Sequence, residues 1–289
     1  MGRRLNRARD AAIEALWARV SRLGPNGRRR LSNLWGAVAG RLPNRALDNW
    51  ARNVEQATGT KPTPAQRRQA GAWWLRNLLE SVTLEHWSAD EITDAVLISD
   101  DDWARLQASF NGPGAVLALG HLGSWDLCGA WVSARGMPVS SVAERLPDAR
   151  FEKFLDARRA VGMTIRSLDE PALMERLVAD VAEGRLVCLL ADRDLRGGGV
   201  GVVWPGRHGG RACSVPPGPA ALARRTGADL MTVTSGYESD KMRIRIGQPI
   251  RHQPGPDGLA AMMQEVVNDI AAAVASSPAD WHVMGRFFR

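Results

Sequence analysis

The sequence predicts an α/β fold with a largely parallel, mixed central sheet flanked by helices, preceded by an N-terminal amphipathic helical region. From about residue 96 onward, short β-branched runs alternate with helical patterns, which is typical of a mostly parallel sheet covered by helices. Before that point the chain carries Trp and Arg at helical spacing, and seven of its eleven Trp precede residue 104. We therefore divide the chain into a basic, Trp-rich helical region, 1–95, and an α/β unit, 96–289, which we expect to pack as one compact body.

The N-terminal region is predicted to form helices. Apolar residues recur at helical spacing between about residues 7 and 22 with arginines among them, and these are Ile13, Leu16, Trp17 and Val20. A second apolar pattern ends at a turn that reaches Pro43, so we expect a helical hairpin; its members are Leu31, Leu34, Trp35 and Val38. Thr63 and Gln66 form a capping-box pattern, with Pro64 at the first helical position.

The elements of the α/β unit follow from the alternation of short apolar runs with helical patterns. Strands are predicted at 114–119, 139–143, 186–190, 200–204, 230–234 and 242–246, and the last two are close enough to form an antiparallel hairpin. Helices are predicted at 124–135, 148–161, 171–183, 217–226 and 257–275. Gly- and Pro-rich loops lie near 197–201, 205–210 and 252–258.

The positive charge of the chain is concentrated at its N-terminus. Residues 1–52 hold 12 Arg and 3 acidic residues, a net charge of +9, whereas the whole chain carries +7. No apolar stretch approaches the roughly 20 residues that a spanning helix needs, and the first residues do not resemble a signal peptide. Arginines interleaved with Trp favour binding to an anionic membrane surface, and the alternative, a nucleic-acid-binding protein, lacks a recognisable motif.

Few classes of cofactor chemistry fit this sequence. The three cysteines, Cys128, Cys188 and Cys213, have no metal-ligand spacing, so we expect free thiols in a reducing compartment and no metal site. No P-loop and no Gly-x-Gly-x-x-Gly that opens a helix is present, which disfavours nucleotide and dinucleotide enzymes.

The motif GHLGSWD, residues 120–126, lies where an apolar strand ends and a helical pattern begins. Ligands bind at the carboxyl ends of strands in such sheets, so His121 is well placed to meet a substrate. A carboxylate such as Asp126 could orient the imidazole while its other nitrogen takes a proton. Ser124 is not in a nucleophile elbow, which disfavours a serine hydrolase. His252 and Asp257 repeat the spacing in a Pro/Gly loop with no strand before it.

Five blocks in the same order connect the chain to a known family. GHLGSWD is followed by VAERLPDARFEKFLDARRAVGM, LLADRDLRGGGVGVVWPG, VPPGPAALARRTGADL and PADWHVM. From about residue 50 to residue 284 the chain resembles the bacterial lysophospholipid and lipid A late acyltransferases, and within them the actinobacterial phosphatidylinositol mannoside acyltransferases. The resemblance implies an acyltransferase catalytic unit over 96–289.

The resemblance assigns roles to individual residues. It implies His121 as general base with Asp126 as its orienting carboxylate, and Asp192 as a catalytic-site residue that either contacts the sugar or supports His121. Some mannoside acyltransferases carry Glu at the position of Asp192. The substrate-binding residues that we expect are Arg145, Arg158, Asp194, Ser124 and Trp125. The stretch 215–220 either starts a helix or presents free amides to an anionic oxygen.

The expected function is that of a peripheral enzyme on the cytoplasmic face of the cell membrane. It would move a long fatty acyl chain from acyl-CoA, a co-substrate, to a hydroxyl of a mannosylated phosphatidylinositol, without a cofactor, an acyl-enzyme or nucleic acid. A lysophospholipid or another glycolipid is the alternative acceptor. The expected partners are therefore acyl-CoA, the lipid acceptor and an anionic membrane surface.

Overall fold

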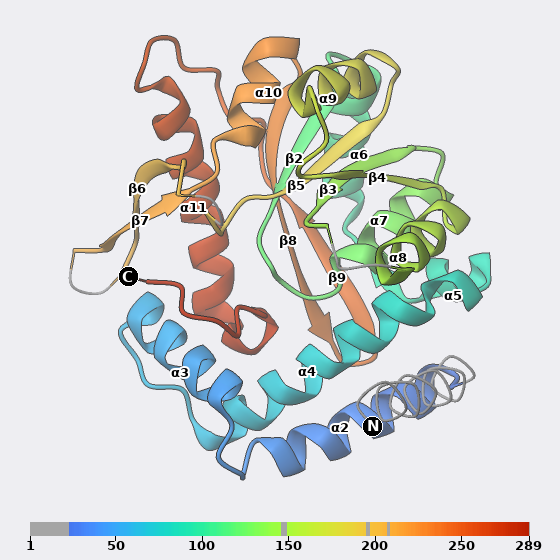
Figure 1. Ribbon diagram of the computed structural model, residues 1–289, viewed down its shortest axis with the longest axis vertical. Helices are drawn as coiled ribbons and strands as arrows, with labels where there is room; N and C mark the ends of the chain where they lie inside the picture. The colour runs from blue at the N-terminus through green and yellow to red at the C-terminus, as the bar shows by residue number, and fades with distance from the viewer. Residues whose placement is uncertain (1–22, 146–148, 195–196, 207–208, 289) are drawn as a thin grey trace, which may run out of the picture.

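The computed structural model describes residues 23–145, 149–194, 197–206 and 209–288. In this part of the chain, a seven-stranded sheet forms the centre of the molecule (Figure 1). The strand order is β1-β9-β8-β2-β5-β3-β4, and all neighbours pair in parallel except the β8–β9 hairpin. The strands are β1 Val96–Leu97, β2 Ala115–Leu119, β3 Val139–Ala143, β4 Met163–Ser167, β5 Leu186–Leu190, β8 Asp229–Glu238 and β9 Lys241–Ile246. The prediction of a mixed, largely parallel sheet is confirmed.

Helices cover both faces of this sheet and enclose two apolar cores. The helices of this part of the chain are α5 Ala89–Asp94, α6 Asp100–Asn111, α7 Trp125–Ala134, α8 Ala149–Ala160, α9 Leu173–Ala182, α10 Gly218–Thr226 and α11 Gly258–Ser276. Side chains of β2 alternate between the two cores: Val116 and Ala118 join the core beneath α9, α10 and α11, whereas Leu117 and Leu119 join the core beneath α6 and α7. Short 3-10 turns span Leu84–His86 and Pro278–Asp280.

In the described part of the N-terminal region, three helices form a base below the carboxyl ends of β2, β5 and β8 (Figure 1). They are α2 Pro25–Ala39, α3 Arg45–Thr58 and α4 Pro64–Thr83, and α4 begins with the predicted capping box of Thr63 and Gln66. Trp50 of α3 is fully buried in the core beneath α11, so the base shares a core with the sheet. The boundary at residue 95 stays a prediction, and the helix expected over 7–22 lies outside the described residues.

The predicted elements match the structure closely in the α/β unit. Strands 139–143 and 186–190 have the predicted bounds, and the five predicted helices differ from α7 to α11 by at most two residues at either end. The predicted strand 200–204 is present as β6, Val200–Trp204. It pairs with β7, Arg211–Val215, in a separate antiparallel ribbon and does not belong to the central sheet. Strands β1, β4 and β7 and helices α3, α5 and α6 are not predicted from the sequence.

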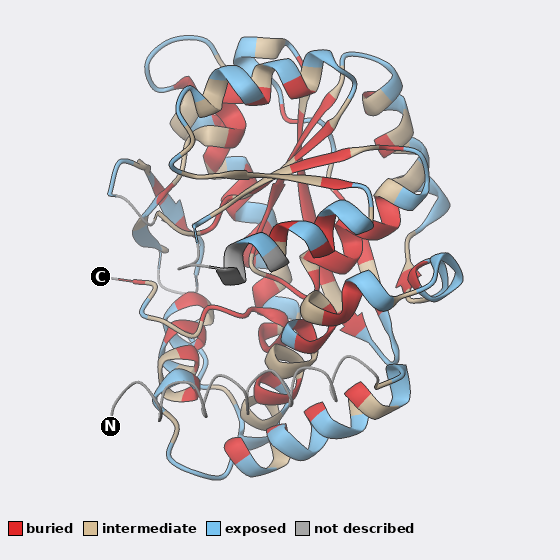
Figure 2. Ribbon diagram, turned by 45° about the vertical axis from the view of Figure 1, so that its right-hand side comes forward, coloured by how far each residue is buried: buried red, intermediate tan, exposed pale blue. Residues whose placement is uncertain are grey.

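Helix α2 packs closely against α4 at Gly36. Its buried face consists of Arg28, Ser32, Gly36 and Ala39, and it lies along α4, which separates it from the sheet (Figure 1). A Cβ atom on Gly36 would lie 2.4 Å from the carbonyl oxygen of Arg68 and 2.6 Å from the Cβ of Ala72. Its larger apolar side chains, which include Leu34 and Trp35, are exposed. Figure 2 shows that much of the α2 ribbon is exposed. No helix among the described residues is long and apolar enough to cross a membrane.

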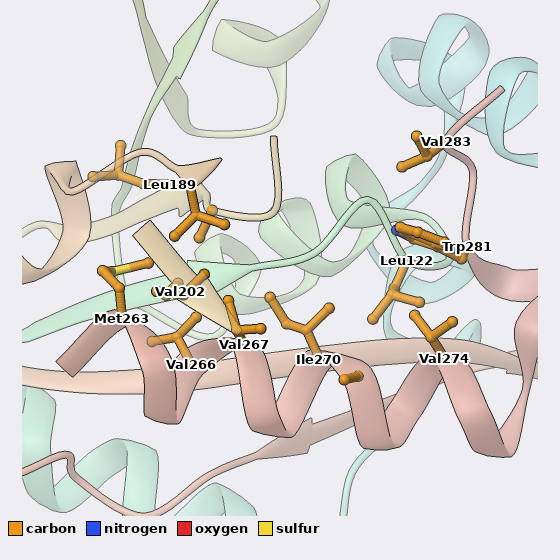
Figure 3. Packing of buried hydrophobic residues seen from close by; sticks show 14 of the residues in the cluster. Leu122, Leu189, Val202, Met263, Val266, Val267, Ile270, Val274, Trp281 and Val283 are labelled. Atoms are coloured by element: carbon orange, nitrogen blue, oxygen red, sulfur yellow. The ribbon is translucent and has the colours of Figure 1, made fainter. Parts of the chain in front are cut away.

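Helix α11 supports the loop that follows β2. Val266, Val267, Ile270 and Val274 form one face of the helix (Figure 3), and Leu122, which follows His121, packs above them with Trp281. The apolar face of α11 therefore fixes the position of the loop that carries His121.

We expect Gly36→Ala to lower the free energy of unfolding by about 1–3 kcal/mol, because α4 leaves no room for a methyl group. Gly27→Ala in the same helix is the matched control, because its Cβ would meet only the flexible side chain of Leu23, at 3.2 Å. The control should be neutral or stabilise by about 0.5–1 kcal/mol. Urea unfolding of both variants checks this, and equal stabilities would contradict the close packing of α2 on α4.

Candidate active site

The site forms where two parallel strands end side by side. Strands β2 and β5 pair in register, with Leu119 opposite Leu190. His121 and Asp192 each follow two residues beyond this pair, so the register brings them together. His121 Nδ1 lies 2.5 Å from Asp192 Oδ1, and the main-chain N–H of His121 donates to Oδ2 at 2.9 Å. The sheet itself therefore positions a histidine–carboxylate pair.

The C-terminal segment holds both members of this pair. The indole Nε1 of Trp281 donates to Asp192 Oδ2 at 3.0 Å, and the main-chain N–H of His282 donates to the carbonyl oxygen of His121 at 2.8 Å. Asp192 and Trp281 are both completely buried. Every hydrogen bond described to the carboxylate thus comes from His121 or Trp281, which leaves little freedom for either group.

The surroundings of Asp192 keep its carboxylate ionised. Burial by itself would raise its pKa, but the charge of His121, the hydrogen bonds from the His121 ring and main chain, and the bond from Trp281 outweigh burial and lower the pKa. A carboxylate at Nδ1 fixes the tautomer in which Nδ1 carries the proton. His121 Nε2, which accepts no hydrogen bond from a described residue, is then free to take a proton from a substrate.

The pairing of His121 with Asp126 that the sequence suggested is not the one that the structure shows. Asp126 accepts hydrogen bonds from Arg158 Nη2 at 2.6 Å and Nε at 3.2 Å, and from Ser81 Oγ at 2.6 Å. Arg158 is 2% exposed, and its guanidinium lies over the ring of Phe154. This buried group ties α7 to α8 and α4. Arg158, which we expected to bind a substrate, is instead paired with Asp126. Asp192 is the carboxylate that contacts His121.

The other predicted residues fall into different surroundings. The ring of Trp125 packs edge-on against that of His121, with centroids 5.5 Å apart. Ser124 is completely buried ahead of α7. Asp194 accepts hydrogen bonds from the N–H groups of Gly197 and Gly199 at 2.8 and 3.0 Å and from Ser214, so it braces the glycine loop. Arg145 is exposed just beyond β3.

The structure also places His252 and the stretch 215–220, which the sequence indicated more weakly. His252 lies in the loop before α11 and bonds through Nε2 to the carbonyl oxygen of Ala228 at 3.0 Å, away from the pair at His121. In the stretch 215–220, residues Pro216 to Pro219 line a cavity, and helix α10 begins at Gly218.

A cavity of about 830 Å³ opens beside His121, in the upper part of the roughly 300–1,000 Å³ range of small-molecule sites. The polar residues that line it include Ser81 of α4, His121, Asp126, Glu144 and Arg193. The remaining walls are mostly aliphatic and include Leu117, Leu119, Val132, Val139, Met163 and Leu186. A long apolar chain therefore fits next to a group able to accept a proton.

Three residues at this site are not predicted from the sequence. Ser81, Trp281 and His282 contact the predicted residues from distant parts of the chain. A signal existed for two of them, because Trp281 and His282 lie in the block PADWHVM. Only the fold reveals that this block lies against the loop after β2.

His282 introduces a pH dependence of stability. Burial, and then the nearby charge of His121, lower its pKa to about 3. In the unfolded chain it would titrate near 6.5, so the unfolded state binds more protons between these two values and stability falls as the pH drops below about 6.5. His282→Phe should remove this loss, so the stability of the variant relative to the wild type should rise by about 2 kcal/mol between pH 7.5 and pH 5. Urea unfolding at several pH values tests this, and parallel stability curves would contradict it.

The Asp126–Arg158 pair should behave as a structural unit. Asp126→Leu leaves a buried guanidinium uncompensated and should cost about 3–5 kcal/mol of unfolding free energy. The double variant Asp126→Leu/Arg158→Met should recover most of that loss, because neither charge is then buried alone. Additive losses in urea unfolding would contradict the pairing of the two charges. A single variant with wild-type stability and weakened substrate binding would give Arg158 the substrate-binding role that the resemblance implies.

Comparison with known proteins identifies the family. The family model described as "Bacterial lipid A biosynthesis acyltransferase" matches residues 3–289. A phosphatidylinositol mannoside acyltransferase of Mycolicibacterium smegmatis is 32% identical over 247 residues, which cover 84% of this chain and 78% of that protein. The protein of the same name from Mycobacterium tuberculosis strain CDC 1551 is 32% identical over 248 residues, 84% of this chain and 76% of its own length. The chain with His121 and Asp192 at the end of its central strands belongs to the bacterial lipid A biosynthesis acyltransferase family.

Proposed function

We propose that this acyltransferase moves a fatty acyl group from acyl-CoA to a hydroxyl of a mannosylated phosphatidylinositol, with His121 as general base. The observation that carries the proposal is the position of His121 in the wall of a mostly apolar cavity, with Nδ1 bound to Asp192 and Nε2 left for a substrate. The apolar walls suit the acyl chain, and the imidazole suits a hydroxyl acceptor.

The proposed reaction is a direct transfer. Nε2 of His121 takes the proton of the acceptor hydroxyl while its oxygen attacks the thioester carbonyl carbon, and the ionised Asp192 stabilises the imidazolium that forms. The carbon–sulfur bond then breaks, and the departing thiolate takes the proton from the imidazolium. An ester and a free thiol result, and His121 returns to its neutral form. Trp281 and the main chain of His282 act as positioning groups in this scheme, because they hydrogen-bond to Asp192 and to the carbonyl oxygen of His121.

The choice of acceptor rests on the mycobacterial relatives, whose printed names are phosphatidylinositol mannoside acyltransferases. Exposed Arg145, beyond β3, is a candidate contact for an acceptor phosphate. A lysophospholipid or another glycolipid is the alternative. Incubating the purified protein with radiolabelled palmitoyl-CoA and each lipid separately tests the choice, and labelling of a lysophospholipid but not of the mannosylated lipid would reject the proposed acceptor.

The outer face of α2 supports docking of the enzyme on a membrane. Its exposed apolar side chains are Leu31, Leu34, Trp35 and Val38, with Leu42 beyond the helix end, and their exposed fractions run from 37% to 64%. Arg30, Arg41 and Arg45 are exposed on or beside the same helix. Large apolar residues beside arginines suit the interface of an anionic bilayer, where buried apolar area and surface charge both contribute. We therefore propose a peripheral location on the cytoplasmic face of the cell membrane.

We expect His121→Ala to abolish transfer and Asp192→Asn to slow it by at least about two orders of magnitude, because the imidazolium loses its counter-charge. His252→Ala is the control and should turn over like the wild type, since His252 contacts Ala228 instead of the pair. Initial rates and melting temperatures measured together separate catalysis from folding. Wild-type turnover in folded His121→Ala would refute the general-base role.

The membrane proposal predicts a specific loss in liposome binding. Leu34→Ser/Trp35→Ser should lower co-sedimentation with anionic liposomes at least about tenfold, even at low salt, because apolar burial is not screened. Val203→Ser is the control, because Val203 is 47% exposed on β6, outside α2. For the wild type, binding should weaken as salt rises from 0.1 M, where the Debye length is about 10 Å, to 1 M, where it is about 3 Å. Equal binding by the folded α2 variant and the control would remove this face from the proposal.

A further inference from the structure

Strand β8 extends beyond the end of its neighbour β2. Strand β2 ends at Leu119, opposite Val233, whereas β8 continues to Glu238. Strand β9 pairs with this extension on one side, but on the side of β2 no strand in the described part of the chain pairs with it. A buried main-chain N–H without an acceptor is costly, so the free edge of the extension needs another partner.

The side chain of Asp280 supplies that partner. Its Oδ1 accepts a hydrogen bond from the main-chain N–H of Tyr237 at 2.8 Å, and its Oδ2 accepts one from the hydroxyl of Ser277 at 2.6 Å. Gly236 makes room for the carboxylate, because a Cβ atom on this residue would lie 2.6 Å from Oδ2 and 3.0 Å from Cγ of Asp280. Asp280 is only 3% exposed. Its carboxylate therefore lies directly against the main chain of β8.

The main chain of residues 280–282 pairs with that of residues 121–123, the loop after β2. At one end of this pairing, the N–H of Gly123 donates to the carbonyl oxygen of Asp280 at 3.0 Å. An antiparallel bridge lies at its centre, and the bond from the N–H of His282 described above lies at the other end. The anchor of Asp280 on β8 and the loop that carries the base are thus joined through a rigid stretch of main chain.

We propose that Asp280 is a positioning residue for acyl transfer, which holds the Trp281 indole and the loop of His121 in place from β8. This role rests on the proposed function, in which His121 is the general base. Asp280 fixes Trp281, whose indole donates to Asp192 Oδ2 at 3.0 Å, and the same carboxylate binds Nδ1 of His121. Asp280 is not among the described residues that line the cavity. Its loss should therefore disturb the reacting groups, where a displacement of about 1 Å can cost about 100-fold in rate, and leave substrate binding unchanged.

Substitutions on both sides of the contact test this role by steady-state kinetics. Asp280→Ala should lower kcat by about 10- to 100-fold with KM within about twofold of the wild type. Asp280→Asn should restore most of the rate, because its amide oxygen still accepts the N–H of Tyr237. Gly236→Ala should reproduce the loss, since its methyl group would displace the carboxylate, and should add nothing to Asp280→Ala, which leaves room for that methyl group. Gly201→Ala on β6 is the matched control, because nothing lies within 4 Å of its Cβ position.

Nitrogen-15 NMR of the Trp281 indole reports the positioning without turnover. Its N–H signal, assigned by comparison with Trp281→Phe, should move in Asp280→Ala and Gly236→Ala and return towards the wild-type position in Asp280→Asn, because it senses the bond to Asp192. Thermal melts of each variant allow rates to be expressed per folded molecule.

The outcomes separate the role of Asp280 from the proposed function. Wild-type kcat and an unmoved indole signal in folded Asp280→Ala would overturn the positioning role, while loss of transfer in His121→Ala would leave the general base standing. Losses that multiply in Asp280→Ala/Gly236→Ala would also overturn it, because the two residues would then act independently. Wild-type turnover by His121→Ala would refute the general base, and with it the role of Asp280 in transfer.

Discussion

A completely buried carboxylate, Asp192, is the constraint on which the rest of the site depends. A buried charge is costly unless its oxygens are hydrogen-bonded, and here the donors come from His121 and Trp281, 71 residues before it and 89 residues after it in the chain. The first donor is placed by the register of β2 and β5, and the second by the segment that packs over α11. The carboxylate thus joins the sheet, the loop after β2 and the chain's last segment, and it fixes which nitrogen of His121 faces the cavity.

The same segment connects the site to the helical base. Asn53 of α3, a buried amide, donates to the carbonyl oxygens of Val283 and Gly285 at 2.9 and 2.6 Å, and Trp50 donates to that of Pro278 at 3.3 Å. The residues that follow Trp281 are therefore held by α3 on one side and by His121 on the other. Helix α4 contributes Ser81 to the buried Asp126–Arg158 pair. Helix α2, which is proposed to meet the membrane, packs on α4, so it belongs to the same packed unit as the residues proposed to perform the reaction.

The sequence was sufficient for most elements of the α/β unit, but not for which elements lie side by side. Alternating apolar runs located 139–143 and 186–190 residue for residue, whereas β4 went unpredicted because only Met163 of its five residues is fully buried. The sequence identifies both His121 and Asp192, but the spacing and the family resemblance favour Asp126, five residues from His121, as the partner, with support of His121 by Asp192 as an open alternative. The correct partner follows only from the strand order, because Asp192 lies next to His121 only when β5 pairs with β2. Likewise, no local sequence pattern indicates that Ser81 contacts Asp126 or that Trp281 contacts Asp192.

The central claim is that Asp192, rather than Asp126, holds the proton on Nδ1 of His121, and nitrogen-15 NMR of the imidazole rings tests it most directly. Comparison with His121→Gln assigns the signals of His121. In the neutral ring of the wild type we expect a protonated Nδ1 and an unprotonated Nε2; this preference should weaken in Asp192→Asn and persist in a folded Asp126→Asn variant. A neutral His121 that carries its proton on Nε2, or a tautomer that responds to Asp126→Asn and not to Asp192→Asn, would contradict the account.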